Sequence, residues 1–538
     1  MALTLSSARL CSELKLLPDL ISVVNAITVG AGSPANTGEA RAIHSLPNAP
    51  PHHVLNWCEC ITGSVVPVFP VKQFLISRVL PVYAVCTMLI SIKVLIYGVP
   101  MPLRLTIQVF SEGEWSDAAT LTVENPERVA EGRCFVAYDN DYIIANFDRM
   151  EDRCELALSV NLPLNWDHHD VRGYPAFLYD IIPSGAAKES LESRYGRLKP
   201  EGVEMELYLL ERFTPAPIGH MRIKESVEGL QPERSEAFAR AEVVDRTNEF
   251  LEYAYETGAA LGGATGANGQ APKLVMTEAH GGVLYADAML PDDQACRHWL
   301  IKFARNRGGE RDKDILRTEF HYYKAVAALG LDTVPTDGLA LEEAVKPSLW
   351  MPRFDRRVVD GVVERIPMES VYSICGITGY GHSMAHAEVV HRLVGLWMDN
   401  GQQDEVDDLV FEYVRRDLLN RILGNTDNHG RNTSIIRVGG RFRLAPIYDL
   451  APMILDEEGI SRTTKWAAEH KGSSNWRDNC AELAGYTDPD VLLQRLMNAA
   501  GEFRALPDLL IDAPESMRNA APLPVNNLDK RLVEWGLR

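Results

Sequence analysis

The sequence predicts an α+β protein with a β-rich N-terminal part and a mainly helical C-terminal part. The first observation is the alternation of apolar and polar residues in Leu103–Phe110 and Ala118–Val123, on either side of a Ser-Glu-Gly-Glu turn, which is typical of a β-hairpin. The second is the apolar spacing of Asp404–Leu423, which indicates an amphipathic helix. The third is Thr487–Asp490, a helix start with proline near the first turn.

Elements of both types are expected between these segments. Further short strands are predicted at Arg133–Tyr138 and Tyr142–Phe147, and another at Trp299–Phe303. Arg317–Leu329 reads as a helix because its apolar residues share one side and a glycine follows it. Asp167–Asp170 is interpreted as a solvated loop and not as a metal site, since four consecutive polar side chains point in too many directions to converge on one ion.

Composition limits the classes of function. The chain has 538 residues, of which 24% are charged, and a net charge of −20, so it is long enough for more than one domain. The acidic surplus argues against a surface built for nucleic acid, because such binding neutralises phosphates with Lys and Arg. It leaves room for a local basic patch or a basic protein partner. Nine cysteines without a C-x-x-C pair indicate reduced thiols in a cytoplasmic protein.

Residues 1–100 differ from the rest of the chain. They carry ten charged side chains, six basic and four acidic. Val79–Ile92 is an uncharged run of 14 residues, shorter than the roughly 20 that a membrane span needs, and Pro81 interrupts it. We therefore expect no membrane association. Three interpretations stay open: a poorly specified extension, a small accessory module, or translation from an upstream start with the working protein beginning at Met101.

Gly424–Asp449 holds the polar residues around which the chain is organised. Asp427 and Asn432 stand five residues apart, and a Gly-Gly turn between two β-prone runs predicts a hairpin that returns the chain to Asp449. Protein kinases use such a set: an Asp that accepts the substrate hydroxyl proton, an Asn five positions on, and a later Asp. Carboxylate and amide oxygens suit Mg²⁺, a hard cation. The pattern therefore predicts a phosphoryl-transfer site.

Two segments, TDNHGRN and FRLAPIYDLAP, carry a resemblance to HipA-like serine/threonine kinases, the toxin halves of bacterial toxin–antitoxin pairs. The resemblance covers about Met101 to the C-terminus. It implies a two-lobed protein-kinase-like fold, with Asp427 as the catalytic base and Asn432 and Asp449 as metal ligands. It also implies ATP and Mg²⁺ as cofactors, a protein substrate, and a HipB-like DNA-binding antitoxin as a possible partner.

The same resemblance assigns residues to the nucleotide. A glycine-rich run before Lys273 leaves backbone N–H groups free to approach phosphates, and Lys302 resembles the kinase lysine that meets the α/β-phosphates, with Glu319 as its partner. LWMPRFDR resembles the hinge that meets adenine. The candidate nucleotide-binding residues are Gly262, Gly263, Gly266, Lys273, Lys302, Met351, Arg353 and Asp355. The early regulatory serine of this loop is absent, which puts autophosphorylation there in doubt.

These assignments divide the chain into four parts. They are the extension 1–100, a β-rich subdomain 101–250, a nucleotide-binding part 251–357 and a helical catalytic lobe 358–538. One alternative is a non-catalytic nucleotide-binding regulator acting through an antitoxin-type partner. Another is a metal-dependent phosphoesterase using Asp427 and His429, although no upstream ligand cluster matches it. His382, His386 and His391 are taken as ordinary histidines, because the zinc-protease pattern would need Glu after the first.

Overall fold

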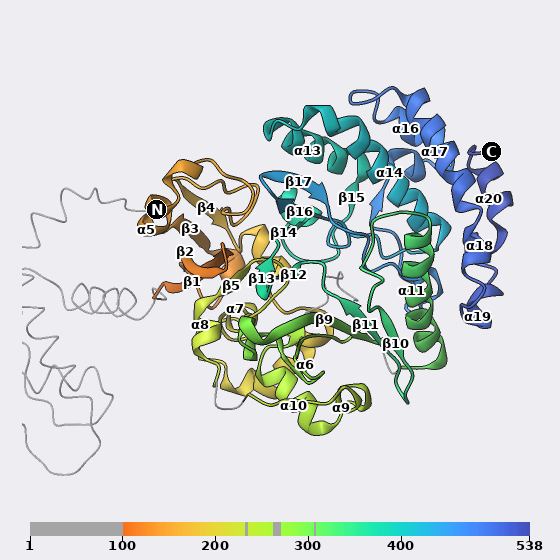
Figure 1. Cartoon of the computed structure of the whole chain (residues 1–538). Coiled ribbons are helices and arrows are strands. Elements are labelled where there is room, and N and C mark those ends of the chain that lie inside the picture. The colour runs from red at the N-terminus through yellow and green to blue at the C-terminus, as the bar shows by residue number, and fades with distance from the viewer. Residues whose placement is uncertain (1–100, 232–234, 262–270, 306–307) are drawn as a thin grey trace, which may run out of the picture. The chain divides into compact units, whose positions relative to one another are not determined.

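A five-stranded antiparallel sheet begins the described part of the chain. The structure is a computed structural model, and it describes residues 101–231, 235–261, 271–305 and 308–538. The strand order is β4-β3-β2-β1-β5, and β1, β2 and β3 lie side by side in orange in Figure 1. The strands are β1 (Leu103–Ser111), β2 (Glu114–Val123), β3 (Arg133–Tyr138), β4 (His168–Arg172) and β5 (Met221–Ile223).

The turn between β1 and β2 confirms the predicted hairpin. Glu112 and Gly113 both have positive φ, +53° and +87°, as a two-residue turn that matches the strand twist requires. Inward-facing residues of the two strands, including Ile107 and Leu121, are fully buried. The helices that follow in this part of the chain are α5 (Asn140–Ala145), α6 (Gly185–Tyr195), α7 (Met205–Arg212), α8 (Lys224–Glu228), α9 (Arg240–Asp245) and α10 (Asn248–Glu256).

Two predictions for this subdomain are wrong. Tyr142–Phe147 was expected to be a strand, but it overlaps α5 and a short 3-10 turn, and β3 pairs with β2 and β4 instead. Asp167–Asp170 was expected to be a loop, but its last three residues belong to β4. The polar side chains are tolerated there because β4 is an edge strand, and Asp170 accepts a 2.8 Å hydrogen bond from Arg133.

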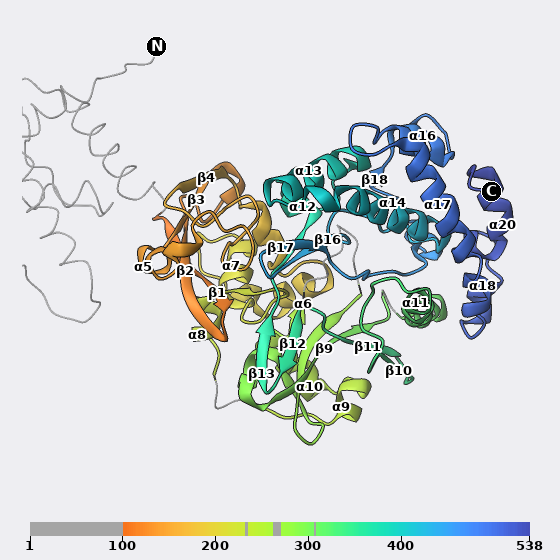
Figure 2. The same cartoon turned by 45° about the horizontal axis from the view of Figure 1, so that its top comes forward.

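A second antiparallel sheet carries the lysines of interest. Its order is β10-β11-β9-β7-β6, with β8 also paired to β7. The strands are β6 (Ala260–Leu261), β7 (Lys273–Ala279), β8 (Leu284–Ala286), β9 (Ala295–Phe303), β10 (Ala340–Glu342) and β11 (Ser348–Pro352). Helix α11 (Glu310–Ala328) packs against β10 and β11, and in Figure 2 it is seen nearly end-on beside them. It begins seven residues earlier than predicted.

The C-terminal part is mainly helical, and its core joins α11, α13, α14 and α17 through buried side chains such as Val326, Val390, Leu418 and Leu496. The helix start predicted at Thr487–Asp490 is confirmed, and Asp488 caps α17 by accepting from the N–H groups of Asp490 and Val491. The elements are β12 (Arg356–Val359), β13 (Val362–Arg365), β14 (Met368–Ser370), α12 (Val371–Ile374), β15 (Met384–Ala385), α13 (His386–Asp399), α14 (Val406–Ile422), β16 (Ser434–Val438), β17 (Arg441–Leu444), β18 (Thr464–Lys465), α15 (Ala467–His470), α16 (Trp476–Ala481), α17 (Pro489–Phe503), α18 (Leu506–Leu509), α19 (Glu515–Arg518) and α20 (Leu528–Glu534).

The predicted fold class is therefore confirmed: a β-rich N-terminal region is followed by a helical C-terminal lobe. Residues 1–100, expected to be an extension, lie outside the described residues. No helix in the described ranges is both long and apolar enough to cross a membrane.

Candidate active site

Lys302 and Glu319 form a buried ion pair between β9 and α11. The Lys302 ammonium donates to Glu319 Oε2 at 2.6 Å, and Glu319 is only 1% exposed. Tyr323 lies one helical turn further along α11 and donates to the other oxygen of Glu319 at 2.8 Å. Both carboxylate oxygens are thus fixed, and the acid holds Lys302 in place. The resemblance to HipA-like kinases predicted this pairing.

Asp449 is held by two lysines. Lys302 donates to Asp449 Oδ1 at 2.6 Å, and Lys273 donates to Oδ2 at 3.0 Å. Burial alone would raise the pKa of Asp449, but the two ammonium groups outweigh it and hold that pKa well below its usual range. Burial would lower the pKa of Lys302, and the carboxylates of Asp449 and Glu319 raise it above its ordinary value instead. Asp449 and Lys302 therefore both keep their charges inside the protein.

The β16–β17 hairpin brings Asp449 back to the loop that follows α14. Gly439 and Gly440 form its turn, both with positive φ, as predicted. In the loop, the side chain of Asn432 donates to the backbone oxygen of Asp427 at 2.6 Å. Asp449 itself has φ +53°, a left-handed conformation that Asp and Asn tolerate better than most residues. The acids expected at one point do converge.

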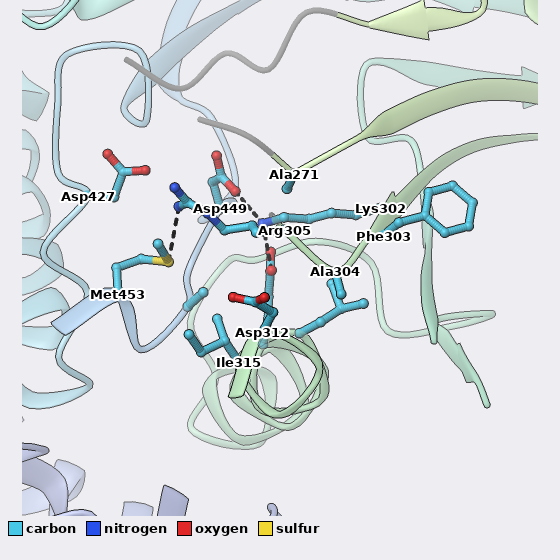
Figure 3. Close-up of a pocket in the computed structure, with 13 residues that line it drawn as sticks. Ala271, Lys302, Phe303, Ala304, Arg305, Asp312, Ile315, Asp427, Asp449 and Met453 are labelled. Carbon is cyan, nitrogen blue, oxygen red and sulfur yellow. Dashed lines mark hydrogen bonds and ion pairs between the residues drawn. The ribbon is translucent and has the colours of Figure 1, made fainter. Parts of the chain in front are cut away.

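One pocket of about 400 Å³, part of it open to solvent, collects the charged groups. Asp427 and Asp449 contribute to it from the C-terminal lobe, and Lys302 reaches it from β9, as Figure 3 shows. Arg305, three residues beyond Lys302, also lines this pocket and contacts Met453 Sδ at 3.7 Å. Four acids (Asp312, Glu319, Asp427 and Asp449) and two basic groups therefore line one small pocket.

A larger cleft of about 1020 Å³, also partly open, adjoins that pocket and shares Lys302, Glu319 and Asp449 with it. Met351 and Tyr448 line it, as do Lys273 and residues from the N-terminal subdomain such as Ile218. An apolar cleft that ends in lysines and a carboxylate suits a planar ring with a charged tail. Gly262, Gly263 and Gly266 lie outside the described residues.

Arg353 and Asp355, at the predicted hinge, belong to a buried charge network. Arg353 binds Asp355 through two hydrogen bonds of 2.9 and 2.6 Å and Asp287 through one of 2.9 Å. Asp355 also accepts from Arg356 and from the N–H of Gly219, each at 2.8 Å. Burial would raise the pKa of Asp355, but the two arginines lower it to about 2. The carboxylate lines the cleft, and both of its oxygens already accept hydrogen bonds. Its role in nucleotide binding stays a prediction.

Some residues of this region were not predicted. Tyr323 could have been found from its spacing of four from Glu319 on a helix. Arg431 lies within the TDNHGRN segment and lines the larger cleft, but nothing in the sequence indicated its partners. Asp180, which lies near it, is too distant along the chain to leave a local signal.

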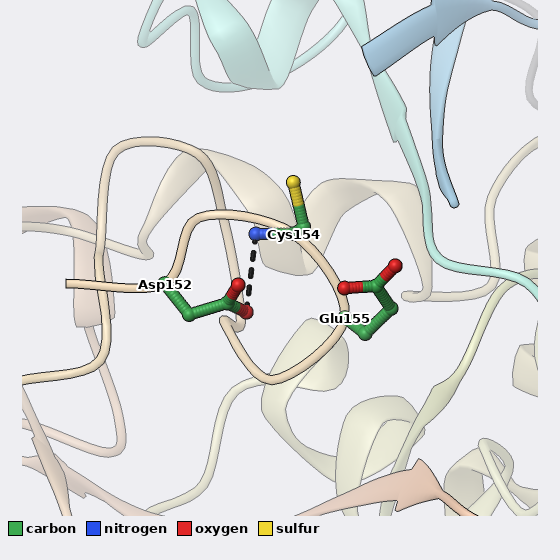
Figure 4. A group of neighbouring side chains, drawn as sticks. All are labelled: Asp152, Cys154 and Glu155. Carbon is green, nitrogen blue, oxygen red and sulfur yellow. Dashed lines mark hydrogen bonds between the residues drawn. The ribbon is translucent and has the colours of Figure 1, made fainter. Parts of the chain in front are cut away.

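Two groups of possible metal-ligating side chains occur elsewhere in the described residues. In the first, shown in Figure 4, Asp152 accepts from the N–H groups of Cys154 and Leu156, and Arg149 pairs with Asp152 and Glu155. The second consists of His386, Asp417 and Glu469, whose carboxylates are bound by Arg462. Arginine and backbone groups already neutralise both groups, so neither indicates a metal.

The fold and the convergent charged groups define a kinase-like protein. Residues 263–505 match the family model described as the HipA-like C-terminal domain. The resemblance seen in the sequence is thereby confirmed.

One solved structure agrees with this match at the level of the fold. The Shewanella oneidensis MR-1 toxin–antitoxin complex of HipA, HipB and operator DNA contains a chain 17% identical to this one. The match covers 80% of this chain and 96% of that one, with a TM-score of 0.53. The Helicobacter pylori proinflammatory kinase CtkA is 16% identical over 44% of this chain and 88% of its own, with a TM-score of 0.29.

A curated relative matches a shorter stretch. It is the Sinorhizobium fredii protein named "Putative kinase Y4mE", which is 29% identical over 136 residues. The match spans 24% of this chain and 30% of that protein's length.

Proposed function

We propose that this chain is an ATP- and Mg²⁺-dependent serine/threonine protein kinase of the HipA-like toxin class. It would transfer the γ-phosphate of ATP to a protein hydroxyl. The observation that carries the proposal is the buried Lys302–Glu319 contact of 2.6 Å. The same lysine also donates to Asp449, beside the pocket that Asp427 lines. A lysine fixed by a helix acid next to two C-lobe acids is the arrangement that phosphoryl transfer uses.

Each residue has a proposed task. Lys302 and Lys273 would neutralise phosphate oxygens, since both ammonium groups already lie at the cleft. Met351 would pack on the adenine ring from β11. Asp427 would accept the proton of the attacking hydroxyl, which requires that its carboxylate reach the pocket, as it does. The glycine-rich run before Lys273 would cover the phosphates.

The residues present fit a divalent cation. Asn432 Oδ1 is buried and has no hydrogen-bond partner among the described residues, and a buried amide oxygen without a donor is costly. The Asp449 carboxylate is the second candidate ligand. Mg²⁺ prefers such oxygen ligands, and when bound it would neutralise charge on the phosphates. Asn432 is kept in place by its own side-chain N–H, which binds the loop backbone at Asp427.

A direct test measures transfer of labelled γ-phosphate from ATP by the purified full chain, to itself and to casein. Asp427→Asn keeps the size of the side chain but removes the base, so transfer should fall by about two or more orders of magnitude. Asp512→Asn, an exposed acid on the surface, is the matched control and should be unchanged. Wild-type transfer in the Asp427 variant would refute the role of Asp427. No transfer by the wild type, with ATP binding retained, would favour the non-catalytic regulator.

We also propose a HipB-like DNA-binding partner. The support is that the Shewanella structure of the same fold is a complex of HipA with HipB and operator DNA. Light scattering of this chain mixed with a HipB-like protein should show the summed mass. Two separate masses would count against that partner.

A further inference from the structure

The arginine of the candidate catalytic loop is enclosed by aromatic rings from two parts of the chain. Arg431 lies one residue before Asn432 and is 1% exposed. Its guanidinium carbon lies 4.6 Å from the ring centre of Tyr380, 5.1 Å from that of Tyr372 and 5.7 Å from that of Tyr179. Tyr179 belongs to the N-terminal subdomain, in the 3-10 helix Ala176–Asp180, and it also packs edge-on against Tyr380.

Few hydrogen bonds hold this guanidinium. Its Nη2 donates to the carbonyl of Gly379 at 2.8 Å, but Nε and Nη1 have no hydrogen-bond partner among the described residues. The nearest carboxylate is Asp180, whose Oδ1 lies 3.6 Å from Nε, within ion-pair range but beyond a good hydrogen bond. The position of Arg431 therefore depends largely on ring faces and one carboxylate, and the subdomain supplies Asp180 and one of the rings.

Asp180 also fixes the segment against which the loop rests. Its oxygens accept from the hydroxyl and the N–H of Ser370, at 2.6 and 2.9 Å. The next two residues, at the start of α12, donate their N–H groups to loop carbonyls: Val371 to Thr433 and Tyr372 to Gly430. One carboxylate of the N-terminal subdomain is thus connected to the loop both through Arg431 and through the backbone of α12.

A separate contact fixes the same subdomain to the C-terminal lobe. Glu369, 2% exposed, accepts from the hydroxyl of Ser159 at 2.6 Å and from the N–H of Val160 at 2.9 Å. Its first oxygen also accepts from Ser373 of α12 at 2.6 Å. Because these contacts are buried, the subdomain is a fixed part of this lobe, and Tyr179 and Asp180 meet the loop from a rigid support.

We propose that Tyr179 and Asp180 of the N-terminal subdomain are positioning residues that set the geometry of the Asp427–Asn432 loop through Arg431. This inference rests on the proposed kinase function for its activity readout. Neither residue needs to touch the substrate. They hold the arginine next to Asn432, and the chemistry is sensitive because a misplacement of about 1 Å can lower a rate by roughly 100-fold. The subdomain would then be a part of the catalytic machinery.

The test replaces the ring and the carboxylate separately. Tyr179→Leu removes the aromatic face, and Tyr179→Phe keeps it. Asp180→Asn removes the charge near Arg431 while keeping an acceptor for Ser370. Phe147→Leu makes the same aromatic-to-leucine change at a side chain of this subdomain that is 65% exposed. For each full-length variant, kcat, the KM for ATP, the ATP dissociation constant and the thermal midpoint are measured. Hydrogen exchange of residues 425–434 is followed as well.

The proposal expects a split between turnover and binding. In Tyr179→Leu and Asp180→Asn, kcat should fall by about ten-fold or more, with KM and the ATP dissociation constant within about two-fold of wild type. Tyr179→Phe keeps the aromatic face, so its kcat should equal that of the wild type. The kcat of Phe147→Leu should equal it as well. Wild-type kcat in both test variants would overturn the proposal. A loss that follows a lower thermal midpoint or weaker ATP binding would overturn it too, since it would indicate a general structural effect.

Hydrogen exchange separates this inference from the proposed function. If the wild type transfers no phosphate, the kinase proposal fails, and the loop can still be examined. Faster exchange within 425–434 in Tyr179→Leu and Asp180→Asn, but not in Tyr179→Phe, would support positioning of the loop by the subdomain. Exchange equal to that of the wild type would refute it.

Discussion

Lys273 and Lys302 lie opposite each other on β7 and β9, and their ammonium groups bind the two oxygens of the same carboxylate, that of Asp449. Without nucleotide, Asp449 therefore has cations on both sides. A phosphate chain that enters the cleft would offer both lysines new oxygens and release the acid. The following predictions separate the tasks of these groups.

Lys302→Met removes the charge but keeps most of the stem. Binding of ATP should weaken by about ten-fold or more, because a charge-assisted contact is lost and about 1.4 kcal/mol corresponds to one decade. Calorimetry with ATP and Mg²⁺ measures this, and Lys324→Met, an exposed lysine of α11, is the control. An unchanged dissociation constant would place the lysine outside the nucleotide site.

The same variant leaves Glu319 buried without its cation. Breaking such a pair costs about 3–5 kcal/mol, so the single variant should unfold at a lower temperature without nucleotide. The double variant Lys302→Met/Glu319→Gln keeps an acceptor for Tyr323 and should recover most of that loss while ATP stays weakly bound. Thermal unfolding of the wild type, the single variant and the double variant measures this loss and its recovery. Stronger ATP binding in the double variant than in the single one would contradict a phosphate role for Lys302.

Asp449→Asn tests the proposed metal ligand. Asn also tolerates a positive φ, so the backbone at +53° should persist while the charge is removed. The gain in ATP affinity that Mg²⁺ gives the wild type should largely disappear, because one anionic oxygen ligand is lost. The experiment is a Mg²⁺ titration of ATP affinity, with Asp512→Asn as the control. An undiminished Mg²⁺ effect in the variant would assign the metal to other residues.

Asp355 gives a prediction for pH. Its pKa in the folded chain is about 2, below the ordinary 3.8, because Arg353 and Arg356 stabilise the charged form. The carboxylate's contribution to stability is therefore complete above about pH 4 and is lost as pH falls toward 2. The wild type should exceed Asp355→Asn in free energy of unfolding at pH 5, and the difference should shrink toward pH 2. Denaturant curves across that range measure it, and a constant difference would contradict the ion pairs.

A chain that begins at Met101 should fold like the full chain. Met101 is 85% exposed and β1 begins two residues later, so the described structure starts at its surface. Thermal midpoints of the two proteins should agree within about 1 °C, which corresponds to about 1 kcal/mol for a chain of this size. A markedly lower midpoint for the shorter chain would mean that residues 1–100 pack on it.

Local patterns predicted much of the fold. The Gly-Gly turn of the β16–β17 hairpin and the helix start at Thr487–Asp490 depend on a few adjacent residues, and both are found. Tyr142–Phe147 misled the prediction because β propensity depends strongly on tertiary context, and most of this segment forms helix α5 instead. The Lys302–Glu319 pair could be predicted because kinase motifs occur in a fixed order. The contacts of Arg431 with Tyr179 and Asp180 could not, because they arise from tertiary packing between distant segments.

The segment Pro217–Gly219 of the N-terminal subdomain is bonded to the hinge: Arg353 and Arg356 donate to the Pro217 carbonyl, and Asp355 accepts from Gly219. The subdomain also holds Glu369 in the C-terminal lobe. The predicted hinge therefore cannot move relative to the N-terminal subdomain without breaking these buried, charge-assisted bonds. The residence time of a bound nucleotide, and with it the rate at which spent ADP could be exchanged, would be governed by these bonds more than by the flexibility of the hinge backbone.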